Sequence, residues 1–288
     1  MKDVAGRVCV ITGGVSGIGR ALAERCVSGG CRGLVIGDLN PEQLATAKGE
    51  LGELGDAEVL TVTMDAGKLE DVQRLLDDTL SAFGAIHLAC FNAGVGGSPG
   101  SMTVLDADLE KWEWVEQVRR AFFFFSTLWT GLQVVNFCPQ VNFWGVLYGS
   151  KLFGKYMSEQ AIESGVESHI INTVSVAGVS GGGLGAYSTS KHSALAVTEK
   201  LMEELQANGA FPTMGASALC PAFVNTNIND GVSRLRSAPA AHGATRSLPS
   251  VCVSFCLRTG EIRRGGGEGR GSQNKGPKER RHAGHARE

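Results

Sequence analysis

Tyr187 and Lys191 stand four residues apart in the segment 186–191, and Ser175 lies upstream of them. On a helix this spacing puts the phenol and the ammonium one turn apart on the same face. A cation in that position favours the phenolate, so the phenol, whose usual pKa is about 10, exchanges protons nearer to neutral pH. This is the property that a general acid or base requires. The spacing alone is a weak signal, because surface helices also carry Tyr and Lys four residues apart.

A glycine-rich segment at residues 12–19 adds a nucleotide site to this acid/base pair. It follows a short apolar strand and opens a helix. Glycines let the backbone approach a pyrophosphate, and a helix N-terminus offers free N–H groups with a partial positive charge. We therefore expect this segment to bind the phosphates of a dinucleotide. The residues expected there are Gly13, Ser16, Gly17, Ile18 and Gly19.

Asp38 ends the second expected strand, roughly 20 residues after the glycine-rich segment. A carboxylate at this point accepts hydrogen bonds from the adenosine ribose hydroxyls and repels a 2′-phosphate. Ser16 and Leu39 are uncharged, so neither supplies a cation to hold that phosphate. These residues favour NAD over NADP as the cofactor. Without the glycine-rich segment, a solvated aspartate in a turn would be the alternative.

The order of apolar and amphipathic segments predicts an α/β fold in one domain. Strands and helices alternate, which is typical of a Rossmann-like, doubly wound parallel sheet with helices on both faces. The strands are expected at residues 8–11, 34–38, 59–62, 86–91, 169–174 and 214–220. The helices are expected at residues 17–27, 41–54, 69–83 and 142–164, and around Tyr187.

Taken together, these motifs resemble the short-chain dehydrogenase/reductase family, in its compact single-domain NAD(P)-dependent form. The resemblance covers about residues 5–230 apart from the segment 118–140. The motifs occur in the family's order, which is more specific than any one of them. The matching positions are 12–19, Asp65, 92–94, Asn142, Ser175, Tyr187, Lys191 and 221–226.

The resemblance implies a hydride transfer between NAD(H) and a small secondary alcohol or carbonyl compound, with no metal. Tyr187 would transfer the proton, while Lys191 would lower its pKa and hold the nicotinamide ribose. Ser175 would steady the substrate oxygen where charge changes. Asn142 would help to hold a water that relays protons to the lysine. Without the other motifs, a loop serine and a helix asparagine would be structural.

The rest of the cofactor site also follows from the resemblance. The implied contacts are Asp65 and Ala66 at the adenine, Asn92, Ala93 and Gly94 at the sheet and ribose, Tyr187 and Lys191 at the nicotinamide ribose, and Pro221, Val224 and Thr226 beside the nicotinamide. A cap at a strand end is the alternative for Asp65. Phe91 departs from the family, which usually has a second asparagine at that position.

The segment 118–140 breaks the pattern. Residues 111–117 would join residues 141–145 as one continuous helix, but a phenylalanine-rich run and Pro139 lie between them. A proline inside that helix would break it. We interpret 118–140 as an insert in the dinucleotide-binding domain, and a retained intron is one hypothesis for its origin.

The C-terminal region is a second departure. From about residue 233 the chain is rich in Gly, Arg, Ser, Ala and Pro, and it lacks the apolar residues that a core needs. We expect the domain to span 1–232 and 233–288 to be a low-complexity, disordered tail. Residues 251–256 are the one candidate for a final strand, and their pattern is not convincing.

Composition limits the partners and the compartment. A net charge of −2 argues against nucleic-acid binding by the core, and the apolar run 121–135 is too short for a membrane span of about 20 residues. The eight cysteines lack metal-binding spacing and are interpreted as buried thiols in a reducing compartment. The N-terminus leads into a strand with no signal-peptide pattern, so we expect a cytoplasmic protein.

The helices that begin near Asn142 and Tyr187 carry more apolar residues than one sheet face needs. In the family, the equivalent helices pack between subunits, so a homodimer or homotetramer is expected. The residues concerned are Phe143, Trp144, Phe153, Ala194 and Val197. A catalytically impaired protein that binds a nucleotide or a partner is the alternative. The insert and the tail favour it, and the presence of all four catalytic residue types opposes it.

Overall fold

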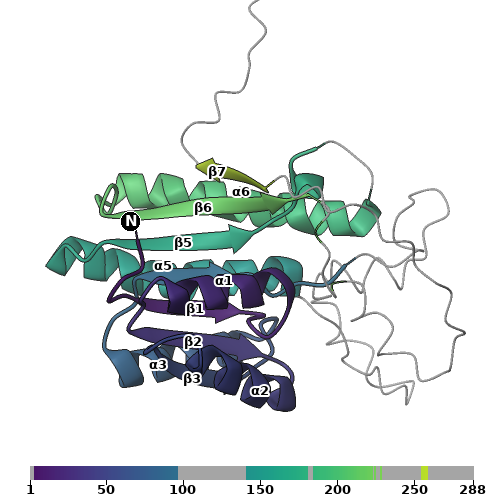
Figure 1. Cartoon of the computed structure of the whole chain (residues 1–288). Helices are drawn as coiled ribbons and strands as arrows, with labels where there is room; N and C mark the ends of the chain where they lie inside the picture. Colours follow the sequence, from purple (N-terminus) through teal and green to yellow (C-terminus); the bar gives the residue numbers. More distant parts are fainter. Residues whose placement is uncertain are drawn as a thin grey trace, which may run out of the picture.

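The computed structural model describes residues 3–96, 141–180, 184–222, 224, 228 and 254–258. The proposed insert 118–140 and most of the region 233–288 lie outside the described residues. A seven-stranded sheet in the order β3-β2-β1-β4-β5-β6-β7 forms the centre of the described part (Figure 1). The pairs from β3 to β6 are all parallel, and this confirms the predicted doubly wound α/β class.

The observed elements agree closely with those expected from the sequence. The parallel strands are β1 (Val8–Thr12), β2 (Gly33–Asp38), β3 (Glu58–Thr63), β4 (Leu88–Phe91), β5 (Ser168–Thr173) and β6 (Met214–Pro221). The longer helices are α1 (Gly17–Ser28), α2 (Pro41–Gly52), α3 (Leu69–Phe83), α5 (Val146–Ser164) and α6 (Gly185–Ala207). Two short helical turns complete the set, the π turn η2 (Val141–Gly145) and the 3-10 turn η3 (Val176–Gly178).

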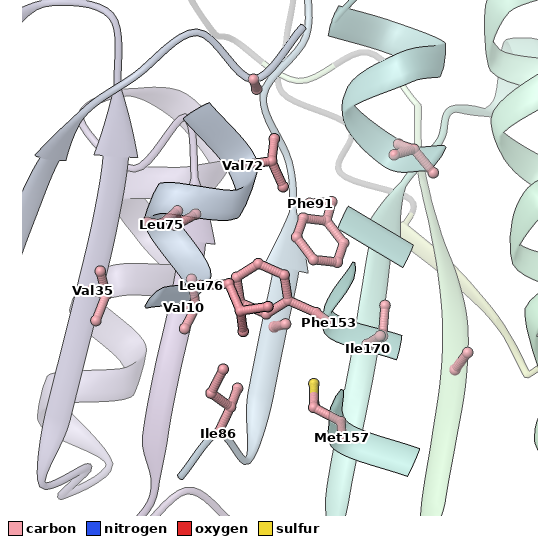
Figure 2. Packing of buried hydrophobic residues seen from close by; sticks show 14 of the residues in the cluster. Val10, Val35, Val72, Leu75, Leu76, Ile86, Phe91, Phe153, Met157 and Ile170 are labelled. Atoms are coloured by element: carbon pink, nitrogen blue, oxygen red, sulfur yellow. The ribbon is translucent and has the colours of Figure 1, made fainter. Parts of the chain in front are cut away.

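Strand periodicity separates the core into two layers. In β1, Val8 and Val10 join the cluster that includes residues of α3, α5 and α6, while Cys9 and Ile11 join the cluster that includes residues of α1 and α2. Successive side chains of a strand point to opposite faces, so each strand supplies both layers. Figure 2 shows the first layer, where side chains of the strands and helices interdigitate. Both sheet faces are therefore buried, as a parallel sheet requires.

Phe91 occupies the position where the family usually has asparagine, and it is absorbed into the core. Its ring packs edge-to-face against that of Phe153, with the centroids 5.2 Å apart (Figure 2). A Cβ atom at Gly149 of α5 would overlap the Phe91 ring, so the absence of a side chain there makes room for it. The phenylalanine at position 91, where the family usually has asparagine, is thus accommodated by the glycine at position 149.

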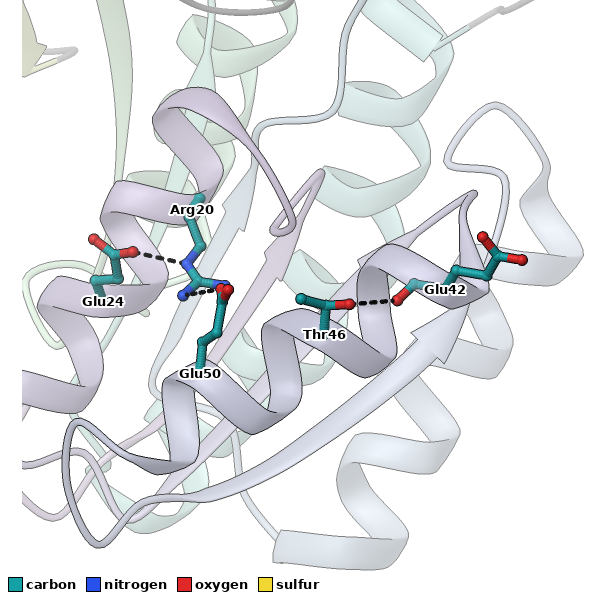
Figure 3. Close-up of polar contacts among 5 residues, drawn as sticks. All are labelled: Arg20, Glu24, Glu42, Thr46 and Glu50. Atoms are coloured by element: carbon teal, nitrogen blue, oxygen red, sulfur yellow. Dashed lines mark hydrogen bonds and ion pairs between the residues drawn. The ribbon is translucent and has the colours of Figure 1, made fainter.

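The segment after β2 is fixed by a capped helix and an ion pair. Asn40 caps α2 by accepting hydrogen bonds from the N–H groups of Glu42 and Gln43, at 3.0 and 3.1 Å. Arg20 of α1 contacts Glu24 at 2.8 Å and Glu50 of α2 at 2.9 Å (Figure 3). The two helices nearest to the glycine-rich segment are therefore linked by a charged contact.

Two sequence-based expectations are wrong. Residues Ser254–Arg258 form β7, which pairs antiparallel with β6 at the sheet edge, so the region 233–288 does contain a strand. Phe153 and Ala194 are fully buried within the chain and are not available to a subunit interface. They fill the layer between the sheet and the helices.

The cysteines and the lengths of the helices bear on the compartment and on membrane insertion. The described cysteines whose side chains are placed are all buried and free, and they are Cys9, Cys26, Cys31, Cys90 and Cys220. Among the described residues, no helix combines the length and the apolar character that a membrane crossing requires.

Candidate active site

The segments expected to do chemistry all follow the carboxyl ends of parallel strands. The glycine-rich segment follows β1, Asp38 ends β2, residues 92–94 follow β4, and Ser175 follows β5. Because these strands are parallel, their carboxyl ends lie at one edge of the sheet, where ligands bind in this class of fold. The order also reverses between β1 and β4, which is the usual position of a dinucleotide.

Two glycines let the backbone of the glycine-rich segment approach neighbouring backbone closely. Gly13 has φ +70°, and a Cβ atom on it would lie 3.0 Å from Cα of Ala93. A Cβ atom on Gly19 would overlap the carbonyl oxygen of Gly13. Ser16 precedes α1 without a side-chain cap, so its hydroxyl does not occupy the N–H groups of the first turn. Gly17 begins the helix, and this bare backbone fits a pyrophosphate.

Asp38 faces the same segment. Its carboxylate accepts a hydrogen bond of 2.8 Å from the N–H of Leu39. Burial raises the pKa of Asp38, and the N–H groups of Leu39, Asn40 and Val15 oppose that shift. Val15 belongs to the glycine-rich segment, so the carboxylate lies beside it. The carboxylate is therefore held by backbone N–H groups at the end of β2.

Asp65 makes the turn that follows β3. One carboxylate oxygen accepts a hydrogen bond of 2.9 Å from the N–H of Gly67, and the Asp65 N–H donates to Asp71 at 2.8 Å. Ala66 is buried, and a Cβ atom at Gly145 would lie 3.1 Å from its carbonyl oxygen. The strand-end role considered for Asp65 is thus present, and the contact of both residues with adenine stays a prediction.

Asn92 joins three strands through side chains that sequence reasoning missed. The Thr12 hydroxyl accepts hydrogen bonds from the N–H groups of Asn92 and Ala93, at 3.0 and 3.2 Å. The Asn92 amide donates to the Thr12 carbonyl at 3.3 Å and accepts from the Thr173 hydroxyl at 3.2 Å. The ends of β1, β4 and β5 are therefore tied together. Threonines at the ends of two apolar strands were the available signal.

Asn142 lies in the π turn η2 and is fully buried. Its amide oxygen accepts from the N–H of Val95 at 2.8 Å. Its amide nitrogen donates to the Val95 carbonyl at 3.0 Å and to the Ser190 hydroxyl at 3.2 Å. Ser190 in turn donates to the Tyr187 carbonyl at 2.8 Å. The side chain therefore joins the loop after β4 to α6, and π turns of this kind recur at functional sites.

Lys191 extends from α6 into the interior. Its ammonium donates a hydrogen bond of 2.9 Å to the Thr173 carbonyl, and only 2% of the residue is exposed. Burial lowers the pKa of Lys191 to about 8. A Cβ atom on Gly94 would lie 2.9 Å from the Asn142 amide oxygen and 3.4 Å from the Lys191 ammonium. Gly94 thus allows those two groups to approach the same stretch of backbone.

Tyr187 is 9% exposed, and the Lys191 ammonium lies 5.8 Å from the centre of its ring. Burial raises the pKa of Tyr187, and a side-chain hydrogen bond with Ser175 partly opposes this. The pKa of Tyr187 is therefore raised from its usual value and not brought nearer to neutrality, as its spacing from Lys191 had predicted. Desolvation disfavours the phenolate, and the ammonium is directed at Thr173 instead.

Ser175 links Tyr187 to the end of β6. Its hydroxyl accepts from the N–H of Ala177 at 3.2 Å and lies 3.5 Å from the Pro221 carbonyl. Together with the bond to Tyr187, these contacts bring the serine, the tyrosine, the lysine and the π turn into one region. Pro221 is buried and Val224 is partly buried, while Thr226 lies outside the described residues.

The sequence matches the family described as short chain dehydrogenase over residues 7–236. That match covers most of the chain. The chain belongs to the short chain dehydrogenase family. This short-chain dehydrogenase is accordingly an oxidoreductase that uses a nicotinamide cofactor to transfer a hydride to or from an alcohol or carbonyl group.

Named relatives and solved structures agree with this membership. A 3beta-hydroxysteroid dehydrogenase of Eggerthella lenta is 30% identical, and the match covers 85% of this chain and 83% of the relative. A 1-deoxy-11-beta-hydroxypentalenate dehydrogenase of Streptomyces exfoliatus is 32% identical over 81% of this chain and 72% of the relative. A short chain dehydrogenase/reductase from Burkholderia phymatum, solved with NAD, is 35% identical with a TM-score of 0.66, covering 86% of this chain and 76% of that one.

Proposed function

We propose that this short-chain dehydrogenase interconverts a secondary alcohol and its ketone with NAD(H), and that Tyr187 is the general acid and base. The observation that carries the proposal is the convergence of Ser175, Tyr187 and Lys191, with the Lys191 ammonium 3.4 Å from where a Cβ atom on Gly94 would lie. This grouping supports a role of the three side chains in one proton-transfer site.

Each residue has a distinct role in this proposal. In ketone reduction the Tyr187 phenol donates its proton to the substrate oxygen, and Ser175 donates a hydrogen bond to that oxygen. Lys191 is held by the Thr173 carbonyl and binds the nicotinamide ribose. Asn142 fixes the loop after β4 against α6 through its side chain. When bound, the nicotinamide supplies or accepts the hydride.

The raised pKa of Tyr187 favours the acid role at neutral pH. A phenol that keeps its proton is ready to protonate the oxygen of a ketone, whereas alcohol oxidation needs the phenolate. We therefore expect oxidation to become faster as the pH rises from neutral into the alkaline range. Initial rates in both directions over that range would test this, and an oxidation rate that falls with pH would contradict it.

NAD rather than NADP is the proposed cofactor. The carboxylate of Asp38 lies beside the glycine-rich segment, where it would repel a 2′-phosphate, and Ser16 and Leu39 are uncharged. Titration of NADH and NADPH by their fluorescence gives the two dissociation constants. We expect tighter binding of NADH, and Asp38→Ser should reduce the preference. Tighter binding of NADPH by the unaltered chain would reject the assignment.

The proposed substrate is a secondary alcohol carried on a ring. The names of the relatives support this, since they act on a hydroxysteroid and on a hydroxypentalenate. Val179, which follows η3 close to Ser175, is an apolar residue with 49% of its surface exposed. An exposed apolar side chain at this point suits a hydrocarbon substrate better than a charged one.

A panel of alicyclic and open-chain secondary alcohols, assayed with NAD, tests the proposal. Turnover of at least one alicyclic member is the expected result. Binding of NADH without turnover of any alcohol or ketone would favour a catalytically impaired nucleotide-binding protein. Turnover confined to open-chain alcohols would keep the reaction but reject the substrate class.

We also propose that the chain forms a homodimer or homotetramer in the cytoplasm. Phe143 and Trp144 of η2 and Val197 of α6 are only partly buried, as residues at a subunit interface would be. The five thiols placed in the described part are free and buried, which suits a reducing compartment. We infer a dinucleotide-binding domain over residues 1–232, interrupted by the insert 118–140 and extended by β7. Light scattering would test the assembly, and a monomer would contradict it.

A further inference from the structure

We infer that Asn172 of β5 is a positioning residue, because its amide ties both helices of the proposed catalytic site to one strand. The inference rests on the proposed function, in which α6 supplies Tyr187 and Lys191 and η2, which leads directly into α5, supplies Asn142. Asn172 does not itself contact these groups through its side chain. It would act by fixing the helices that carry them.

The contacts of the amide nitrogen carry the argument. It donates a hydrogen bond of 3.1 Å to the Ser150 hydroxyl of α5 and one of 2.9 Å to the Thr198 hydroxyl of α6. Asn172 is fully buried, and Thr198 passes its own hydrogen on to the Ala194 carbonyl at 2.9 Å. Both amide hydrogens are thus committed, one to each helix.

These contacts fix the placement of α6 along β5. Lys191 and Thr198 are seven residues apart, which is about two helical turns, so their side chains lie on the same face. They bond to neighbouring residues of the strand, Lys191 to the Thr173 carbonyl and Thr198 to the Asn172 amide. A shift of α6 along the strand would break both bonds together.

The amide oxygen of Asn172 shows that a polar side chain at this position has a cost. It is buried and has no hydrogen-bond partner, which carries an energetic penalty. An apolar side chain of similar size would avoid the penalty but would lose the link between the helices. Ser168, on the same strand, also has a buried hydroxyl without a partner, and that hydroxyl makes no hydrogen bond to either helix. It therefore provides a matched control.

The test compares Asn172→Leu with Ser168→Ala and the unaltered chain. The readouts are kcat for the alcohol that the unaltered chain oxidises fastest, its dependence on pH, NADH binding by fluorescence, and amide hydrogen exchange. For Asn172→Leu we expect kcat to fall about tenfold or more, since small misplacements of catalytic groups have large effects on rate. The pH profile should shift, and exchange should accelerate in α5 and α6 but not in α1. Ser168→Ala should leave all four readouts unchanged.

Asn172→Leu with an unaltered kcat, pH profile and exchange pattern would overturn the inference. A loss of stability alone would also overturn it, because that is the result of a purely structural role. If the variant does not fold, Ser150→Ala and Thr198→Val each remove one contact, and each should accelerate exchange mainly in its own helix. If the unaltered chain turns over no alcohol, the proposed function fails, while the exchange comparison still decides whether Asn172 couples the helices.

Discussion

The N-terminal half of this short-chain dehydrogenase and its C-terminal half are held in shape by different means. In residues 3–96 the critical approaches are made by backbone at Gly13 and Gly19, and only three polar side chains of the described part are buried there. In residues 141–222 twelve are buried, and four of them, Ser150, Asn172, Lys191 and Thr198, bond between β5 and the helices α5 and α6. The count of buried polar side chains thus differs between the halves, and the second depends on them more than the first.

This difference predicts which changes each half tolerates. Where the shape depends on missing atoms, adding a single carbon is harmful, while surface exchanges matter little. Where it depends on buried polar groups, removing one partner of a hydrogen bond leaves the other partner unsatisfied. The stability of such a region also depends on the charge state of its buried ionisable groups, and so on pH. The proton-transfer half should therefore be the more sensitive to substitution and to pH.

The largest expected effect is in the C-terminal half, at Tyr187. Tyr187→Phe keeps the ring but removes the exchangeable proton, so kcat should fall by about a hundredfold or more. NADH binding should be retained, because the glycine-rich segment is untouched. Steady-state kinetics and a fluorescence titration provide the two measurements.

Tyr156→Phe is the matched control for that variant. Tyr156 lies on α5, is partly exposed, and donates a weak hydrogen bond of 3.4 Å to the Gly84 carbonyl. It should leave kcat unchanged. A folded Tyr187→Phe variant that retains full activity would show that the acid/base assignment is wrong.

Lys191→Met should separate stability from activity. The pKa of Lys191 is lowered from 10.5 to about 8, so below pH 8 burial of the ammonium opposes folding, and the penalty declines as the pH rises towards 10.5. The variant should lose activity, yet its stability relative to the unaltered chain should be greater at pH 7 than at pH 9.5, by about 2 kcal/mol.

Urea unfolding at the two pH values gives this comparison. Lys200→Met on the same helix is the control, since Lys200 is an exposed residue whose contacts are with Glu203 and Glu204. Its stability difference should not change with pH. An equal difference for Lys191→Met at both values would mean that the ammonium is not buried at a cost.

Gly19→Ala tests the backbone-shaped half. The added Cβ atom would overlap the Gly13 carbonyl and approach the Asn92 amide to 2.6 Å, so the segment must shift. NADH binding should weaken by about tenfold or more, which is the effect of a little over 1 kcal/mol. Gly49→Ala in α2 adds the same atom where nothing lies within 4 Å, and it should leave binding intact. Equal binding by both variants would reject the close-approach argument.

The smallest effect is expected at the ion pair between α1 and α2. Glu50→Gln removes the charge that Arg20 contacts at 2.9 Å, but the Glu50 side chain is 59% exposed and Arg20 keeps Glu24. The free energy of unfolding should change by less than about 0.5 kcal/mol. Thermal unfolding at low and moderate salt measures it, and a much larger loss would mean that the N-terminal half also depends on charged contacts.

The local pattern of apolar and polar residues was sufficient to predict most strands and helices of the fold. The apolar runs predicted β1 to β6, and the bounds expected for α3 match those observed, because strand and helix periodicities are properties of the sequence itself. The candidate strand 251–256 overlaps β7 (Ser254–Arg258), but its short pattern did not carry a prediction, since its pairing with β6 is long-range.

The candidate site, like the fold, was predictable from the sequence only in part. The spacing of Tyr187 and Lys191 indicates a shared helix face, but the raised pKa of Tyr187 depends on burial, which is set by distant parts of the chain. The roles of Thr12, Thr173 and Asn172 likewise arise from partners far away in the sequence. Spacing identifies residues on one element, and only the assembled sheet identifies what they meet.

The fit of Phe91 against Gly149 has a consequence for the history of this chain. With the phenylalanine present, a side chain at position 149 would enter its ring, whereas a smaller residue at position 91 leaves position 149 unconstrained. A route of single substitutions therefore reaches Phe91 only from an ancestor that already had glycine at position 149. Once the ring was in place, replacing Gly149 alone would force the ring to shift, so a larger residue at position 149 requires a smaller one at position 91.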